Sequence, residues 1–191
     1  MCIIAIKKAG VQFPNITTVE TMCDKNPDGF ALVYHDTRDG KARTYRTMNR
    51  EQFLKHYKSV LRTHDYRTTN LFLHARIATH GSLKKENCHG FVDHKTHLSF
   101  AHNGILYSIP NRDDLTDSET FFRDYFIPVF RHGGWFEADR LIRDVIGYSK
   151  FVFMDNKGNI RHYGDYIKDD SGVLYSNNSF RNYSTGWYLK A

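Results

Sequence analysis

Short apolar segments of strand length recur along the chain, and helical patterns lie between groups of these segments rather than between each pair. Regular alternation of strand and helix builds a parallel sheet, whereas grouped strands favour antiparallel sheets with helices in separate layers. We therefore expect an α+β fold. The segments expected as strands are 2–7, 30–36, 41–48, 70–80, 97–109, two strands within 149–164, and 172–178.

Helical periodicity fills the intervening segments. Apolar side chains recur at helical spacing after Asn49, which is a favourable N-cap residue. Pro128 is expected to interrupt a helix, because proline lacks the N–H that an interior helical position donates. The segments expected as helices are 17–29, 49–64, 117–130 and 135–147.

The overall composition is that of one soluble domain spanning 1–191, with 40% hydrophobic and 25% charged residues. The net charge of +6 is scattered rather than gathered in a stripe, so nucleic acid is not an expected partner. No apolar run approaches the roughly 20 residues that span a bilayer, so no membrane association is expected. The three cysteines are widely separated and odd in number, and no secretory signal is visible. These features predict a cytoplasmic protein.

The second residue, Cys2, precedes an apolar segment. Removal of Met1 would leave a thiol and a free α-amine on one residue. The reference pKa of that amine, roughly 7.7–8.0, suits a general base near neutral pH. Cys2 is therefore a candidate nucleophile with its own base, or alternatively a small buried apolar residue at the start of a strand.

The stretch "HARIATHG" places Arg76 in a segment that is otherwise largely apolar. Burying its charge requires an anionic partner, and its planar fork fits a carboxylate. Arg76 is thus a candidate carboxylate-binding residue. The alternative is an arginine on an edge strand that reaches solvent.

The stretch "AHNGIL" contains Asn103 and Gly104 between two apolar runs. Asn-Gly is a strong signal for a two-residue hairpin turn, as is Asp39-Gly40 earlier in the chain. The side-chain amide of Asn103 and the backbone N–H of Gly104 could instead form a two-donor oxyanion hole. Both interpretations remain open from these residues alone.

Asp117 and Ser118 precede an expected helix, which fits an ordinary N-cap arrangement. A carboxylate at this position could also hold a substrate ammonium group. Seven of the eleven histidines lie between His64 and His102, close to Cys88, and could in principle bind zinc. Because no matching cysteine pair accompanies them, we expect no metal and no cofactor.

Taken in order, the second-position cysteine, Asp28-Gly29, "HARIATHG", "AHNG" and "DSE" resemble the class II glutamine amidotransferases, which are N-terminal nucleophile hydrolases. The resemblance covers residues 2–120 by motif. It implies a four-layer αββα sandwich. It also implies that the family's active-site residues lie at the matching positions of this chain.

The resemblance assigns a role to each matching position. Cys2 would be the nucleophile, and Asn103 with Gly104 would form the oxyanion hole. Arg76 would bind the α-carboxylate of glutamine and Asp117 its α-ammonium group. The residues implied as lining the glutamine pocket are Gly29, Thr79 and His80.

The expected reaction is hydrolysis of the glutamine side-chain amide, with ammonia passing to a separate synthase subunit or being released. A γ-glutamyl amide hydrolase that accepts a larger leaving amine would use the same residues. A non-catalytic, basic binding module on the same scaffold is a third alternative, which the net charge of +6 permits.

Overall fold

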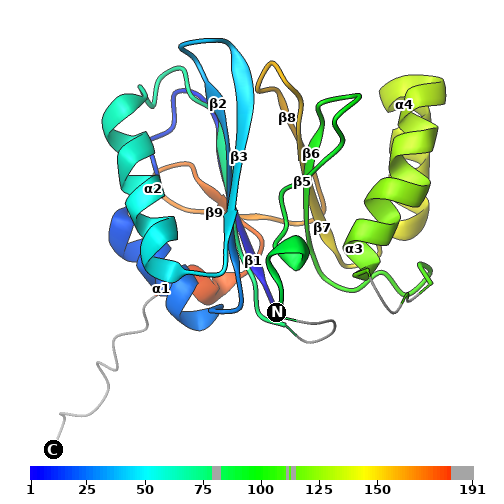
Figure 1. Cartoon of the computed structure of the whole chain (residues 1–191), viewed down its shortest axis with the longest axis horizontal. Helices are drawn as coiled ribbons and strands as arrows, with labels where there is room; N and C mark the ends of the chain where they lie inside the picture. Colours follow the sequence, from blue (N-terminus) through cyan, green and yellow to red (C-terminus); the bar gives the residue numbers. More distant parts are fainter. Residues whose placement is uncertain (79–82, 111, 113–114, 182–191) are drawn as a thin grey trace, which may run out of the picture.

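The structure is a computed structural model that describes residues 1–78, 83–110, 112 and 115–181. Two antiparallel sheets stack face to face, and helices cover the outer side of each sheet (Figure 1). The layers therefore run helices, sheet, sheet, helices. This arrangement confirms the prediction of an α+β, four-layer αββα sandwich.

The larger sheet has six strands in the order β3-β2-β4-β1-β10-β9. The first strand of the chain therefore lies inside the sheet, between β4 and β10. β1 and β4 are antiparallel, so β1 begins at the end of the sheet where β4 stops. The strands are β1 (Ile3–Lys7), β2 (Phe30–Asp36), β3 (Lys41–Thr47), β4 (Leu71–Ala75), β9 (Ile167–Lys168) and β10 (Leu174–Tyr175).

The smaller sheet has four strands in the order β5-β6-β7-β8. Its strands are β5 (Phe91–Val92), β6 (Ser99–Asn103), β7 (Lys150–Met154) and β8 (Ile160–Tyr163). Both faces of the central strands are buried. In β1, Ile3 packs toward the helices of its own sheet, whereas Ile4 packs toward the other sheet. Burial on both faces explains why β1 is continuously apolar instead of alternating.

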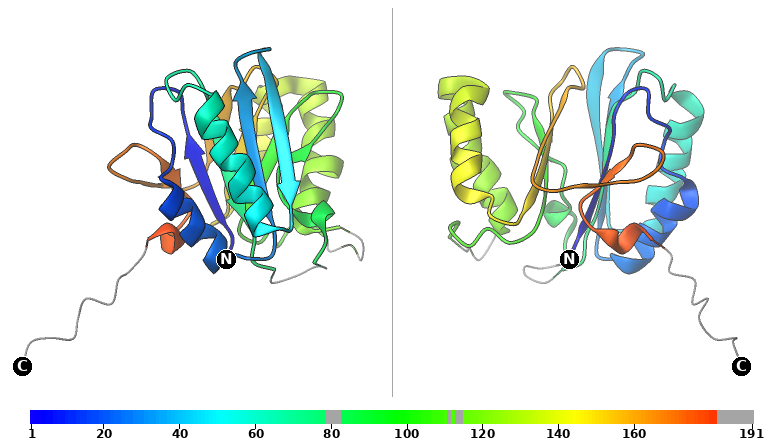
Figure 2. Two further views of the ribbon diagram at one scale, coloured as in Figure 1. Left: turned by 60° about the vertical axis from the view of Figure 1, so that its left-hand side comes forward. Right: turned by 180° about the vertical axis from the view of Figure 1, so that it is seen from behind.

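Helices from two separate parts of the chain cover the sheets (Figure 2). α1 (Ile16–Lys25) and α2 (Arg50–Thr63) pack on the larger sheet. α3 (Asp117–Thr120), the π-helix η2 (Phe121–Phe126) and α4 (Ile127–Val145) pack on the smaller sheet. The short 3₁₀ segments are η1 (Lys85–Asn87) and η3 (Asn178–Phe180). Across the described residues, no helix combines the length and apolarity that crossing a bilayer requires.

Two predictions about chain breaks are wrong. Pro128 does not end the helical run, because the π-helix η2 passes directly into α4 at Ile127 and Pro128 lies at the start of α4. The non-helical residue is Gly134, with φ 59° and ψ −153°. Asn103-Gly104 is also not a hairpin turn, because β6 pairs with β5 and β7 and no strand follows directly after Gly104 among the described residues.

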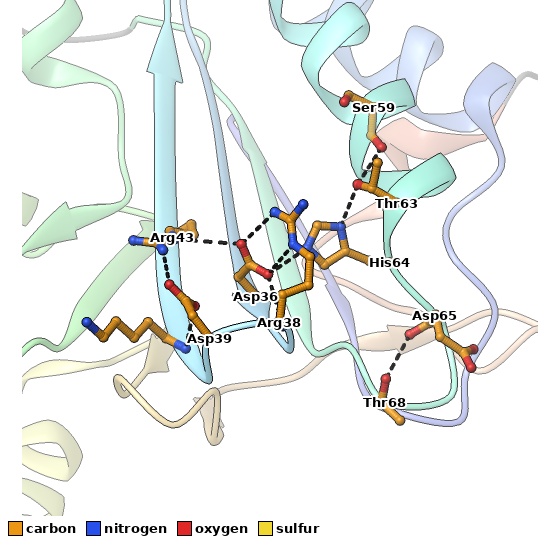
Figure 3. A network of polar contacts seen from close by, with 10 residues as sticks. Asp36, Arg38, Asp39, Arg43, Ser59, Thr63, His64, Asp65 and Thr68 are labelled. Atoms are coloured by element: carbon orange, nitrogen blue, oxygen red, sulfur yellow. Dashed lines mark hydrogen bonds and ion pairs between the residues drawn. The ribbon is translucent and has the colours of Figure 1, made fainter.

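The predicted hairpin at Asp39-Gly40 is confirmed, since β2 and β3 pair across it. The buried carboxylate of Asp36 accepts hydrogen bonds at the base of this hairpin (Figure 3). Arg38 donates to both of its oxygens, with Nε 2.8 Å from Oδ1 and Nη2 2.7 Å from Oδ2. His64 Nε2 lies 3.3 Å from Oδ1, which connects the end of α2 to the hairpin.

Candidate active site

Cys2 immediately precedes β1, at the end of the larger sheet where β4 stops. Its thiol donates to the carbonyl oxygen of Ile77 at 3.5 Å. Its own carbonyl accepts from Asn177 Nδ2 at 2.6 Å. Burial raises the pKa of the Cys2 thiol, and the positive charges of the chain's N-terminus and of Arg76 oppose that rise. The thiol is therefore protonated at neutral pH.

Arg76 directly follows β4, which is an interior strand of the larger sheet. Its backbone N–H donates to Gly29 O at 2.8 Å, and its carbonyl accepts from Asp28 N at 2.9 Å. The residue is 3% exposed, so the alternative of an edge-strand arginine that reaches solvent is wrong. Its positive charge acts on the Cys2 thiol, where it lowers the pKa.

Gly29 fills a position where no side chain fits. Its φ is +142°, and a Cβ placed there would lie 2.5 Å from the Sγ atom of Cys88. Together with the hydrogen bond to Arg76, this brings the predicted pocket glycine beside the predicted carboxylate-binding arginine. The other two predicted pocket residues, Thr79 and His80, lie outside the described residues.

Asn103 is the last residue of β6 and is buried. Its Nδ2 donates to Ser176 Oγ at 2.7 Å. Gly104 has φ +146°, and a Cβ at this position would meet the Oγ of Ser149 at 2.2 Å. Glycine therefore lets the chain leave β6 in a conformation that other residues rarely adopt, with its backbone free of a covering side chain.

Asp117 is the first residue of α3, and the N-cap is Thr116 instead of Asp117 or Ser118. The Asp117 carboxylate accepts from Leu106 N at 2.9 Å, from Ser118 N at 2.7 Å and from Ser118 Oγ at 3.1 Å. A carboxylate has about four lone-pair directions, so among the described residues these partners leave roughly one for a ligand. Asp117 also ties α3 to the loop that begins at Gly104.

A stack of three buried histidines lies beside these residues. The rings of His74 and His89 are 4.1 Å apart and nearly parallel, and His102 follows at 6.2 Å. Burial lowers the pKa of His89 and of His102 to about 3, and that of His74 well below its usual value. All three are therefore neutral. Within the described ranges, no group of three or more histidine, cysteine or acidic side chains has a metal-binding arrangement.

Sequence reasoning missed several residues that contact the predicted site. Ser176 and Asn177 follow β10 and reach Asn103 and Cys2, respectively. The sequence of their segment predicts only an apolar strand with a polar end. No local pattern therefore indicates that these two residues contact the site. The clustering of histidines in the sequence did indicate the histidine stack. Its members are neutral rings packed between strands.

Contacts join most of the described members of the predicted set, whereas Asp117 bonds to the loop after Gly104. Cys2 contacts the residue after Arg76, and Arg76 bonds to Gly29. Asn103 is linked through Ser176 to the strand that carries Cys2, because Ser176 Oγ also accepts from Ile4 N at 2.8 Å.

Comparison with known proteins finds similar sequences and similar folds. A protein of Haemophilus influenzae (strain ATCC 51907 / DSM 11121 / KW20 / Rd) described as "Putative glutamine amidotransferase" is 29% identical over 122 residues, which cover 58% of this chain and 40% of that protein. This chain thus spans less than half the length of that relative.

Two solved structures share the fold. One is the glutamine phosphoribosylpyrophosphate amidotransferase from B. subtilis, with a TM-score of 0.57 and 15% identity over 92% of this chain and 42% of that chain. The other is titled the allosteric regulatory enzyme of purine biosynthesis, with a TM-score of 0.61 and 16% identity over the same shares of the two chains. The family model "Glutamine amidotransferases class-II" matches residues 1–129, and the chain therefore belongs to the class II glutamine amidotransferases.

Proposed function

We propose that this protein hydrolyses the side-chain amide of glutamine, with Cys2 as the nucleophile after removal of Met1. The observation that carries the proposal is the position of the Cys2 thiol, which bonds to the carbonyl of Ile77, the residue after the buried Arg76. A nucleophile beside a buried cation suits a substrate that has both a reactive amide and a carboxylate.

The thiol requires a base because burial raises its pKa. The carbonyl of Ile77 accepts a hydrogen bond but cannot take the proton. An α-amine on Cys2 itself can, with a reference pKa of roughly 7.7–8.0. Met1 is largely exposed, so a processing enzyme can reach the peptide bond that must be cut.

Hydrolysis of the amide would then proceed in two steps. The sulfur of Cys2 bonds to the amide carbon while the α-amine takes the thiol proton. The carbon–nitrogen bond breaks as that proton passes to the leaving nitrogen, and ammonia departs. Water next attacks the thioester, which releases glutamate and restores the thiol. Asn103 Nδ2 and Gly104 N–H would donate to the oxyanion of each tetrahedral intermediate.

The two charged ends of the substrate have matching partners. Arg76 would bind the α-carboxylate through its planar fork. Asp117 would accept from the α-ammonium group in the lone-pair direction that its bonds to Leu106 and Ser118 leave open. Gly29, Thr79 and His80 would line the remaining wall of the pocket.

The ammonia would be delivered to an acceptor enzyme or domain outside residues 1–191. Support comes from the lengths of the proteins compared, because the match covers only about 40% of the relative and 42% of each solved chain.

All three cysteines are free, which supports a reducing compartment and hence the cytoplasm.

The test is release of glutamate and ammonia from glutamine by purified protein, together with intact mass. We expect active protein to lack the mass of one methionine residue, and Cys2→Ala to abolish turnover. Cys23→Ala is the matched control, since Cys23 is a buried cysteine on α1 that packs in the helix-facing core. Full activity in protein that uniformly retains Met1 would rule out the α-amine as base. Faster turnover of a γ-glutamyl anilide than of glutamine would instead identify an amide hydrolase for larger leaving amines.

A further inference from the structure

Ser176 connects the two sheets at the end where the candidate active site lies. It is buried, and it follows β10 directly. Its hydroxyl oxygen accepts from Ile4 N at 2.8 Å and from Asn103 Nδ2 at 2.7 Å. Its backbone N–H donates to Ile4 O at 3.0 Å. A single residue therefore bonds both to the strand that carries Cys2 and to the end of β6.

The register of the larger sheet explains this position. β10 pairs with β1 through Ala5–Tyr175 and Ile6–Leu174, so Ser176 comes opposite Ile4. At that point a side-chain hydroxyl accepts the Ile4 N–H, where a regular ladder would use a backbone carbonyl. The hydroxyl is thereby held in place and can also reach across to the second sheet.

The amide of Asn103 depends on this contact for its orientation. The terminal torsion of asparagine is soft, so an amide without partners can rotate. Among the described residues, the Oδ1 atom of Asn103 is buried and has no hydrogen-bond partner. The bond from Nδ2 to Ser176 is thus the side-chain bond that fixes the plane of the amide.

We infer that Ser176 is a positioning residue for the oxyanion hole: it sets the amide of Asn103 relative to the strand that carries the nucleophile. The inference rests on the proposed function, because it takes Asn103 as the donor to the oxyanion. The next residue reinforces the arrangement, since Asn177 Nδ2 donates to Cys2 O at 2.6 Å. Both residues lie beyond residues 1–129, the part that the family model matches.

A pair of variants isolates the hydroxyl. Ser176→Thr keeps it, and Ser176→Val has nearly the same shape without it. Misplacement of a catalytic group by about 1 Å costs on the order of 100-fold in rate, so we expect kcat for glutamine to fall roughly 10- to 100-fold in Ser176→Val relative to Ser176→Thr. The KM should change less than about twofold, because an oxyanion donor acts in the transition state and hardly in the ground state.

Ser99→Ala is the matched control for lost packing. Like Ser176, Ser99 is buried and its hydroxyl joins the two sheets, since it lies 3.3 Å from Thr44 Oγ1. Ser99 is at the opposite end of β6 from Asn103. We expect its thermal stability to fall about as much as that of Ser176→Ala, with kcat per folded molecule unchanged. If the branched variants do not fold, the comparison of Ser176→Ala with Ser99→Ala decides the question.

The outcomes separate this inference from the proposed function. An active wild type with equal kcat in Ser176→Val and Ser176→Thr would overturn the role of Ser176 alone. A raised KM with unchanged kcat would overturn it as well, since it would place Ser176 in ground-state binding. A wild type without Met1 that does not turn over glutamine would overturn the proposed function and this inference with it.

Discussion

The Nδ1 atom of His102 lies 2.7 Å from the hydroxyl oxygen of Ser118. The same hydroxyl lies 3.1 Å from a carboxylate oxygen of Asp117, and an ionised carboxylate only accepts hydrogen bonds. Ser118 therefore donates to Asp117 and must accept from His102, whose proton is then on Nδ1. Burial keeps His102 neutral by lowering its pKa to about 3, so this direction of donation persists across physiological pH.

Ser118→Ala is expected to raise the KM for glutamine roughly 10- to 100-fold with little change in kcat, because a single hydrogen bond to a charged group is worth about 1.5–3 kcal/mol. The measurement is steady-state kinetics on glutamine. Thr120→Val is the control, since the Thr120 hydroxyl is buried in the same helix and has no hydrogen-bond partner among the described residues. Equal KM values in the two variants would contradict a role for the Ser118 hydroxyl in holding the Asp117 carboxylate for the substrate.

Arg76→Ala is expected to raise the KM for glutamine by at least roughly 30-fold, which corresponds to the lower end of 2–5 kcal/mol for a lost desolvated charge contact. Arg76→Lys should recover only part of the loss, because an ammonium group lacks the planar fork. Arg50→Ala, which removes a partly exposed arginine paired with Asp24 on the outer helices, is the charge-matched control. An unchanged KM in Arg76→Ala would assign Arg76 a purely structural role.

Asn103→Ala is expected to lower kcat by about 10²- to 10³-fold with KM nearly unchanged. In a tight turn, an asparagine is favoured because it tolerates a left-handed backbone conformation. Asn103 does not have this conformation, since among the described non-glycine residues only His97 has a positive φ. Thermal unfolding of the variant separates the two roles. A lowered melting temperature with kcat per folded molecule near that of the wild type would refute the oxyanion role.

Asp36→Asn is expected to destabilise the protein by about 1–2 kcal/mol at pH 7, since its main ionic partner, Arg38, is largely exposed and screened by solvent. The hydrogen bond from Arg38 holds the pKa of Asp36 well below its usual value. A depressed folded pKa contributes stability that is present above the unfolded value of about 3.9 and is lost as pH falls through the folded pKa. We therefore expect the difference in unfolding free energy between variant and wild type to become smaller below pH 4. Urea unfolding from pH 7 to pH 3 measures this difference. A difference that stays constant would contradict this account.

Local patterns were enough to predict the α+β class and most of the strands and helices, whereas the four-layer sandwich was implied by the family resemblance. Asn49 caps α2 by accepting from Gln52 N at 2.9 Å, as its sequence position indicates. Asp39-Gly40 makes the expected hairpin. These features depend on neighbours within a few residues, which a sequence displays directly.

Features set by distant contacts could not be predicted in this way. Asn103-Gly104 carries a strong hairpin signal, yet the strand partners of β6 come from elsewhere in the chain. The packing of Gly104 against Ser149 then decides the local conformation. In the same way, the buried position of Arg76 follows from β4 being an interior strand, which depends on the order of strands in the sheet.

The bond between Ile4 and Ser176 joins positions 172 residues apart in the sequence. A ribosome that adds about 5–20 residues per second needs roughly 10–30 s to make the intervening chain. During that interval β1 has no β10 to pair with, and the wall of the site that Ser176 and Asn177 supply does not exist. Under the proposed function, a nascent chain would therefore have no complete site until residues 174–177 have been made, and Met1 would be removable in that interval, before the Cys2 thiol has its partners.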